Sequence, residues 1–307
     1  MSISILKPGV QTTVQDIGRY GYSHFGISSS GAADLFSFRL GNIIVGNAEE
    51  LAGIEMTLLG ADFQFNSDAV IAITGSPFNL SLDRQEIPYN QSIHVKKNQI
   101  LSVGITKGGA RSYLLVKGGI KTENYLNSKT THVMSGMGGF MGRPLKKGDM
   151  LEIDENSKIN ITDISNDLDE IDTSIIRINK GLQSSYFSDS TWAAFTSKMF
   201  TVSEVFSRMG IRLKGNPIHS SKGNEILTEG IPLGAIQVPG GGEPIISFVE
   251  HQTTGGYPKI ANVISADLCK VGQLKPGDKF QFELVSFEIA ELLCLEQETF
   301  LNKLIHD

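Results

Sequence analysis

The heptapeptide Leu145-Lys-Lys-Gly-Asp-Met-Leu151 recurs later in the chain as Leu274-Lys-Pro-Gly-Asp-Lys-Phe280. In both copies a Gly-Asp pair precedes an apolar run, which is typical of a turn that leads into a β-strand. Glycine supplies the positive φ that such turns require. Gly-Asp turns are also common in ordinary hairpins. Because one copy lies near the end of each half of the chain, the repeat predicts two similar β domains.

Strand patterns dominate the sequence around these two turns. Alternating or β-branched runs, mostly bounded by Gly, Pro, Asn or Asp, predict strands at residues 2–6, 69–74, 100–106, 112–116, 174–178, 199–205, 244–249 and 279–285. Helical periodicity is confined to residues 33–45, a short segment capped by Ser188 and a C-terminal segment capped by Ser286. This pattern favours an all-β barrel or sandwich over βαβ repeats.

The length of 307 residues is large for one core, since single cores stop growing near ~250–300 residues. We therefore expect an N-terminal domain at residues 1–160 and a C-terminal domain at residues 173–307. The polar, acidic segment 154–172 is the candidate joint, with a solvated loop inside one domain as the alternative. The joint stays open, because strands can be exchanged between the two halves.

Charge, hydropathy and cysteine content exclude several classes of protein. The chain has 27 Lys+Arg against 33 Asp+Glu, a net charge of −6, which disfavours a nucleic-acid partner. No apolar run reaches the ~18–20 residues of a membrane helix. The two cysteines make no disulfide framework, the six histidines are scattered, and no signal-peptide pattern opens the chain. We expect a cytoplasmic protein without nucleic-acid, membrane or metal partners.

The first candidate binding segment, residues 9–34, combines glycines, hydroxyls and charged groups ahead of the expected helix. A helix N-terminus can receive an anion, and an arginine can bind a carboxylate or phosphate through two hydrogen bonds. The sequence favours a structural alternative in which Ser28, Ser29 and Ser30 cap the helix, and an Asp16–Arg19 ion pair is an equal alternative to anion binding. The candidate substrate-binding residues here are Gln15, Asp16, Arg19, Ser30 and Asp34.

The second candidate segment, residues 206–215, carries two arginines four residues apart. Arg208 and Arg212 flank a glycine and suit a carboxylate or phosphate, while paired surface arginines are the structural alternative.

The third candidate segment, residues 227–244 and 249–260, is the richest in glycine and polar side chains. Ordinary hairpin loops explain its glycines but not its repeated Gln, Thr and Tyr content. The acid–base candidates are Glu229, Glu250 and Tyr257, and the candidate substrate contacts are Gln237, Thr253, Thr254 and Gly256.

Several motifs run in order along nearly the whole chain. They are Pro8-Gly-Val-Gln-Thr-Thr-Val-Gln-Asp-Ile-Gly-Arg-Tyr-Gly-Tyr22, Ser30-Gly-Ala-Ala-Asp34, Gly138-Gly-Phe-Met-Gly-Arg-Pro-Leu145, Arg208-Met-Gly-Ile-Arg-Leu213, Gly234-Ala-Ile-Gln-Val-Pro239 and Gln252-Thr-Thr-Gly-Gly-Tyr-Pro258. With these motifs the chain resembles the carboxyltransferase-domain family that includes the C subunit of 5-oxoprolinase, the second subunit of allophanate hydrolase and the antagonist of the sporulation kinase inhibitor. The resemblance adds Arg143 to the candidate substrate-binding residues.

The resemblance implies a mainly β fold of two cyclophilin-like β-barrel subdomains, with a few short helices and a C-terminal helix. It also implies one component of an ATP-dependent amidohydrolase that opens 5-oxoproline to glutamate. Such a component acts on a small amide together with a cyclophilin-fold protein of the B-subunit type and a larger A-type subunit, and the complex uses ATP with Mg²⁺. The alternatives are a non-catalytic binding protein that antagonises a kinase inhibitor, and a biotin-dependent carboxyltransferase component acting on urea or a similar amide.

The chain is similar to a divergent member of this family. Asn127-Ser-Lys-Thr-Thr131 stands where the family usually has Gly-Ser-Arg-Ser-Thr, and Glu250-His-Gln-Thr-Thr254 stands where it has Asp-Arg-Gln-Thr-Thr.

Overall fold

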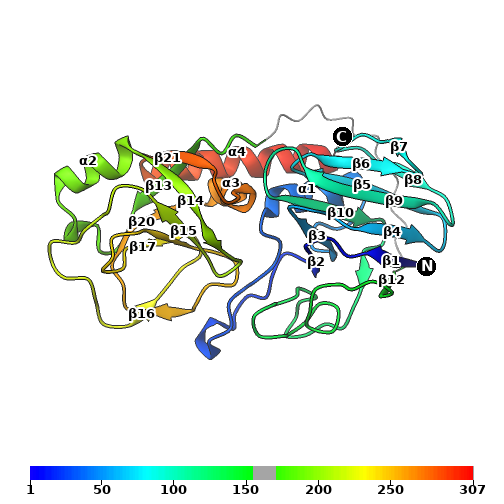
Figure 1. Ribbon diagram of the computed structural model, residues 1–307, viewed down its shortest axis with the longest axis horizontal. Coiled ribbons are helices and arrows are strands. Elements are labelled where there is room, and N and C mark those ends of the chain that lie inside the picture. Colours follow the sequence, from blue (N-terminus) through cyan, green and yellow to red (C-terminus); the bar gives the residue numbers. More distant parts are fainter. Residues whose placement is uncertain (155–170, 307) are drawn as a thin grey trace. The chain divides into compact units, whose positions relative to one another are not determined.

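The computed structural model describes residues 1–154 and 171–306 (Figure 1). Most of the expected joint at 154–172 therefore lies outside the described residues. The chain divides into two compact units. Unit 1 comprises Met1–Arg19, Ser30–Ile171 and Phe300–Asp307, and unit 2 comprises Tyr20–Ser29 and Asp172–Thr299. Each unit thus includes one short segment from elsewhere in the sequence.

Unit 1 is built from two sheets that enclose one core. The seven-stranded sheet has the order β11 (Ile120–Lys121), β12 (Met150–Ile153), β1 (Ser2–Lys7), β4 (Asp62–Phe65), β9 (Ile100–Thr106), β6 (Phe78–Leu82) and β7 (Gln85–Glu86). The five-stranded sheet has the order β2 (Gln11–Gln15), β3 (Gly53–Thr57), β10 (Arg111–Val116), β5 (Ala69–Gly75) and β8 (Ile93–Val95). Alternating apolar residues such as Ile3 and Ile5 in β1 point into this core because side chains along a strand alternate between its faces.

Helix α1 (Leu35–Ile44) packs on the five-stranded sheet of unit 1, so strand β10 is buried on both faces. The sequence-based expectation that Ser28, Ser29 and Ser30 cap this helix is wrong. Asp34 is the N-cap, and its carboxylate accepts the backbone N–H of Ser37 at 3.0 Å. The helix begins later than expected because Ser30 (φ 54°) and Gly31 (φ 88°) are both left-handed and turn the chain.

Unit 2 is a closed seven-stranded barrel. Its order is β13 (Ile175–Lys180), β20 (Lys259–Val263), β17 (Ala235–Gln237), β18 (Ile245–Ser247), β15 (Gly210–Lys214), β14 (Met199–Phe206) and β21 (Lys279–Leu284), and it closes where β21 runs parallel to β13 (Figure 1). Two further strands pair beside it: β16 (Glu229–Gly230) and β19 (Thr254–Gly255). The mainly β fold expected from the sequence is confirmed, and all eight predicted strands are present.

The helices of unit 2 are short except for the last. They are α2 (Asp189–Ser197), α3 (Leu268–Gln273), the 3₁₀ turns η1 (Ser23–Phe25), η2 (Ser184–Tyr186) and η3 (Ser265–Asp267), and most of α4 (Phe287–His306). The predicted cap of α2 is confirmed, because the Ser188 hydroxyl accepts the Thr191 N–H. Helix α2 buries Phe195 in the barrel core, where its ring stacks on Phe282 with centroids 4.8 Å apart.

Helix α4 is the C-terminal helix that the sequence predicts. The Ser286 hydroxyl accepts the Ile289 N–H at its start, as expected. Its last turns belong to unit 1, where Leu301 is fully buried and Phe300 packs near Phe36. None of the described helices is long and apolar enough to cross a lipid bilayer.

The first copy of the repeated heptapeptide forms a tight turn before β12. Gly148 has φ 90°, and its N–H donates to the Ile5 carbonyl at 2.8 Å. The Ile5 N–H donates in return to the Asp149 carbonyl at 2.9 Å, and the Lys146 N–H donates to the Asp149 carboxylate at 2.7 Å. The turn therefore fixes the register of β12 against β1.

The second copy repeats these contacts before β21 in unit 2. Gly277 also has φ 90°, and its N–H donates to the Val202 carbonyl at 3.0 Å. The Val202 N–H donates to the Asp278 carbonyl at 2.9 Å, and the Lys275 N–H donates to the Asp278 carboxylate at 3.0 Å. The two heptapeptides are thus the same structural element in two units.

We expect Gly148→Ala and Gly277→Ala each to lower the free energy of unfolding by about 1–2 kcal/mol, because a Cβ disfavours the left-handed conformation. Neither substitution causes a clash, since nothing lies within 4 Å of the added Cβ. Gly241→Ala is the control, because Gly241 has open space around it and no positive φ. Urea unfolding measures the difference. Equal stability of all three variants would contradict the assignment.

The Arg143 guanidinium donates to both oxygens of Asp149, at 2.7 and 3.0 Å, and holds the pKa of that carboxyl below its ordinary value of 3.8. A carboxyl whose folded-state pKa is depressed stabilises the fold above its unfolded pKa and loses this contribution as the pH falls through the folded value. We expect Asp149→Asn to be less stable than wild type at pH 7, with the gap closing below pH 3.8. Urea unfolding from neutral pH down to strongly acidic pH measures it. A constant gap over that range would refute the linkage.

Candidate functional site

The end of strand β2 in unit 1 carries a buried polar cluster. The Asp16 carboxylate accepts hydrogen bonds from the Gly18 N–H at 2.8 Å, from the Ser128 hydroxyl at 2.8 and 2.9 Å, and from the Lys129 N–H at 2.6 Å. Asp16 is only 6 % exposed. It therefore joins two segments that are more than 100 residues apart in the sequence.

Arg19 continues this cluster and is also buried. Its guanidinium donates to the carbonyls of Tyr125 and Thr130, both at 3.1 Å, and lies over the Tyr125 ring. Gly138 packs against it so closely that an added Cβ would lie 2.6 Å from Arg19 Nη2 and 2.3 Å from the Thr130 carbonyl oxygen. The glycine at this position thus allows the loop to approach the arginine.

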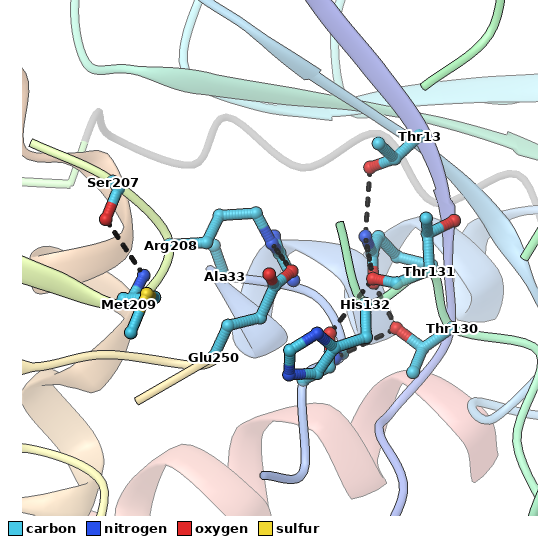
Figure 2. Close-up of polar contacts among 12 residues, drawn as sticks. Thr13, Ala33, Thr130, Thr131, His132, Ser207, Arg208, Met209 and Glu250 are labelled. Atoms are coloured by element: carbon cyan, nitrogen blue, oxygen red, sulfur yellow. Dashed lines mark hydrogen bonds and ion pairs between the residues drawn. The ribbon is translucent and has the colours of Figure 1, made fainter. Parts of the chain in front are cut away.

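Gln15 and Ser30 complete the polar cluster of unit 1. The Gln15 amide donates to the Thr13 hydroxyl at 2.9 Å and to the Thr131 carbonyl at 3.2 Å, and the Ser30 hydroxyl donates to the same carbonyl at 3.0 Å. Figure 2 shows Thr13, Thr130 and Thr131 of this cluster. Four of the five residues that the sequence singled out in segment 9–34 are therefore brought together, and the contacts just described hold the loops of unit 1 in place.

Asp34, the fifth of them, adjoins a buried ion pair of Glu55 and Arg111, which the sequence did not mark as a candidate site. The Tyr113 hydroxyl donates to Glu55 Oε2 at 3.0 Å and accepts the Asp34 N–H at 2.8 Å, while the Ala33 N–H donates to the same Glu55 oxygen at 2.8 Å. Arg111 Nε lies 3.5 Å from Glu55 Oε1. Burial, with Glu55 and Asp34 nearby, raises the pKa of Tyr113 well above its ordinary value. Charged residues within the apolar strands β3 and β10 are the signal that could have found this cluster.

In unit 2, Arg208 and Glu250 form a buried ion pair. Arg208 Nε lies 2.5 Å from Glu250 Oε1, and their side chains are 3 % and 1 % exposed. The Glu250 N–H also donates to the Arg208 carbonyl at 2.8 Å. Figure 2 shows the guanidinium and the carboxylate facing each other. Each charge is therefore balanced by the other inside the fold.

The other two candidate arginines have different partners. Arg212 lies 3.5 Å from Glu243 with both side chains more than a third exposed, as in the surface alternative. Arg143 belongs to the Gly148 turn of unit 1, where it binds Asp149. Each of them thus pairs with a carboxylate other than the buried Glu250.

A second ion pair of unit 2 joins Glu229 to Lys259, a residue of the third candidate segment that the sequence did not mark as a candidate. Lys259 Nζ lies 2.5 Å from Glu229 Oε1, and the Gln183 amide donates to the same oxygen at 2.8 Å. The ion pair with Lys259 and the bond from Gln183 lower the pKa of Glu229. Lys259 is 1 % exposed. A lysine within the buried run of β20 is the signal that could have found it.

Strand register places further candidates of the third candidate segment around this pair. Glu229 lies opposite Gly255, Gly230 opposite Thr254, and Gln237 opposite Lys259. The Gln237 amide donates to the Ser247 hydroxyl at 3.1 Å.

The remaining candidates of the segment act through the backbone or face outward. The Thr253 carbonyl accepts the Ile231 N–H and the Gly256 carbonyl accepts the Ile226 N–H. The Tyr257 side chain is 42 % exposed.

His251, next to Glu250, is a titratable group that the sequence-based prediction did not include. Its Nδ1 lies 2.8 Å from the Gln252 carbonyl, and burial lowers its pKa. This geometry assigns the hydrogen of the neutral ring to Nδ1, because a carbonyl only accepts. Across residues 1–154 and 171–306, no three His, Cys, Asp or Glu side chains are placed to hold a metal ion.

The chain is similar to known proteins over almost its whole length. The model of the family "Carboxyltransferase domain, subdomain A and B" matches residues 25–284. The C subunit of 5-oxoprolinase from Haemophilus influenzae is 35 % identical, with 98 % of this chain and 97 % of that protein aligned. The Escherichia coli protein of the same name is 33 % identical over equal shares.

The crystal structure of the K. lactis urea amidolyase matches with a TM-score of 0.92 and 33 % identity. The match covers 99 % of this chain and 20 % of that chain, so the chain spans about a fifth of the amidolyase. With the family match over residues 25–284 and relatives similar from end to end, the chain belongs to the carboxyltransferase domain family, subdomains A and B.

Proposed function

We propose that this chain is one component of a cytoplasmic, ATP-dependent amidohydrolase that opens 5-oxoproline to glutamate. It would work with a cyclophilin-fold protein of the B-subunit type and a larger A-type subunit. The observation that supports this most is the end-to-end similarity to two proteins named as the C subunit of 5-oxoprolinase, with 97 % of each covered. The urea amidolyase of Saccharomyces cerevisiae is equally similar at 35 %, but this chain covers 18 % of it.

The chemistry requires activation, because a lactam is a weak electrophile. Phosphoryl transfer from ATP to the ring carbonyl oxygen would let water add to the carbon. The ring C–N bond then breaks as the nitrogen takes a proton, and a second water hydrolyses the resulting acyl phosphate, which releases phosphate and glutamate. We assign ATP and Mg²⁺ to the complex as a whole and not to named residues of this chain.

The contacts of unit 2 change the roles that the sequence suggested for its charged residues. Arg208 is neutralised by a fully buried Glu250, so the pair is better suited to holding the loop before β15 than to binding a substrate. Glu229 is ionised and partly exposed, beside Lys259 and Gln183. Thr254 lies next to this group by strand register, and we propose that it and Tyr257 orient the ring.

A second candidate function is a biotin-dependent carboxyltransferase component acting on urea or a similar amide. The TM-score of 0.92 to the K. lactis urea amidolyase supports it. The two functions differ in the second substrate, since one consumes water and ATP and the other a carboxylated biotin carrier.

We expect 5-oxoproline-dependent ATP hydrolysis only when this chain is combined with its B-type and A-type partners. Release of phosphate and of glutamate is measured, with single omissions and with urea in place of 5-oxoproline as controls. Full activity without this chain would refute the proposal. A stable complex without turnover would instead favour the binding-protein alternative.

We expect Arg208→Met to lower the free energy of unfolding by about 3–5 kcal/mol, because it removes the arginine that is paired with the buried Glu250 carboxylate. Arg208→Met combined with Glu250→Leu should recover most of this loss. Arg212→Met, at an exposed pair, is the control and should stay within about 0.5 kcal/mol of wild type. Urea unfolding measures all three. An Arg208→Met protein of unchanged stability but without activity would restore the substrate-binding role.

A further inference from the structure

We propose that Lys259 anchors the carboxylate of the substrate, and that Glu229 occupies this position in its absence and is displaced by the incoming ligand. Glu229 is then neither a general base nor a fixed structural residue, but an internal competitor for the site. The inference rests on the proposed function only for the identity of the carboxylate, 5-oxoproline.

The ammonium group of Lys259 needs an anion at all times. Its side chain is 2 % exposed, and its neighbours on β20, Ile260 and Ala261, are fully buried. Removing a charge from water is costly unless an opposite charge lies beside it. Lys259 Nζ meets this requirement through Glu229 Oε1 at 2.5 Å.

Glu229, in contrast, can leave the pair at little cost. Its side chain is 36 % exposed, and it lies on the two-residue strand β16. The next residue, Gly230, has open space on its Cβ side, with nothing within 4 Å. A carboxylate that is already partly in water loses little by turning fully into it, so only the lysine is obliged to keep a partner.

Gln183 gives the position a hydrogen-bond donor beside the ammonium group. Its Oε1 accepts the Lys259 backbone N–H at 3.1 Å, which fixes the orientation of the amide and turns Nε2 toward Glu229 Oε1 at 2.8 Å. The ammonium and the amide therefore converge on one oxygen atom. A ligand oxygen placed there would receive the same two contacts.

This geometry suits a carboxylate of single charge. The group that now fills the position is itself a carboxylate, and exchanging one for another leaves the net charge around Lys259 unchanged. The arginines that the sequence suggested for this task are occupied, Arg208 by Glu250 and Arg212 by Glu243. A neutral amide such as urea offers no charge to the lysine, so the site selects a substrate that carries a carboxylate of its own.

Equilibrium dialysis of 5-oxoproline against the full chain, without its partner proteins, tests the proposal. We expect Glu229→Gln to bind at least about tenfold more tightly than wild type, because it keeps the shape of Glu229 and removes the competing charge. Lys259→Met should bind at least about tenfold more weakly. Lys275→Met, which removes a lysine paired with Asp278 elsewhere in unit 2, is the matched control and should bind like wild type.

The ligand class is identified by competition in the same dialysis, with acetate, inorganic phosphate or urea added against 5-oxoproline. Acetate should compete more strongly in Glu229→Gln than in wild type, and urea should not compete. Equal or weaker 5-oxoproline binding by Glu229→Gln would overturn the proposal, and so would stronger competition by phosphate than by acetate. If the affinity order holds but the reconstituted complex shows no turnover, the proposed function fails and the carboxylate site stands.

Discussion

A charge enclosed in this fold needs an opposite charge or hydrogen bonds beside it, and the interior of both units is arranged around that constraint. Arg208 with Glu250 and Lys259 with Glu229 meet it in unit 2. Glu55 brings together Arg111, the Tyr113 hydroxyl and a backbone N–H in unit 1. Since an unpaired buried charge would cost a large fraction of the net stability of a domain, each pair fixes the loops that carry it.

The two pairs of unit 2 differ in the exposed fraction of their carboxylates. Arg208 and Glu250 are both enclosed, so neither can exchange its partner without unfolding the surroundings. Lys259 is enclosed and Glu229 is not. The same interaction is therefore structural in one place and exchangeable a short distance along the sequence, and only the exposed fraction of the carboxylate separates the two cases.

Much of the fold could be predicted from the sequence because its signals are local. The Gly-Asp turns at Gly148 and Gly277 need only a left-handed residue, and the strands that follow them alternate visibly. The two-residue strands β16 and β19 carry no such period, and barrel closure by the parallel pair of β13 and β21 depends on contacts between segments far apart in the sequence. The cap of α1 could not be predicted, because Ser and Asp are equally good caps and only the left-handed turn at Ser30 and Gly31 selects Asp34.

The candidate site was harder to predict, because the type of a residue does not show which other residue it contacts. The sequence marks Glu229 as an acid–base candidate, but it does not mark Lys259 as a functional residue. Their contact joins two strands, and the role of each depends on it. The sequence likewise predicts that Arg208 binds a ligand, whereas the structure pairs it with Glu250, which is 42 residues away.

The division of the chain into units also determines when unit 1 can complete its folding. Leu301, on the last turns of α4, is fully buried among residues of α1 and the five-stranded sheet. These residues emerge from the ribosome long before Leu301 exists. Part of the apolar surface of unit 1 therefore stays uncovered until the segment that contains Leu301 has been synthesised.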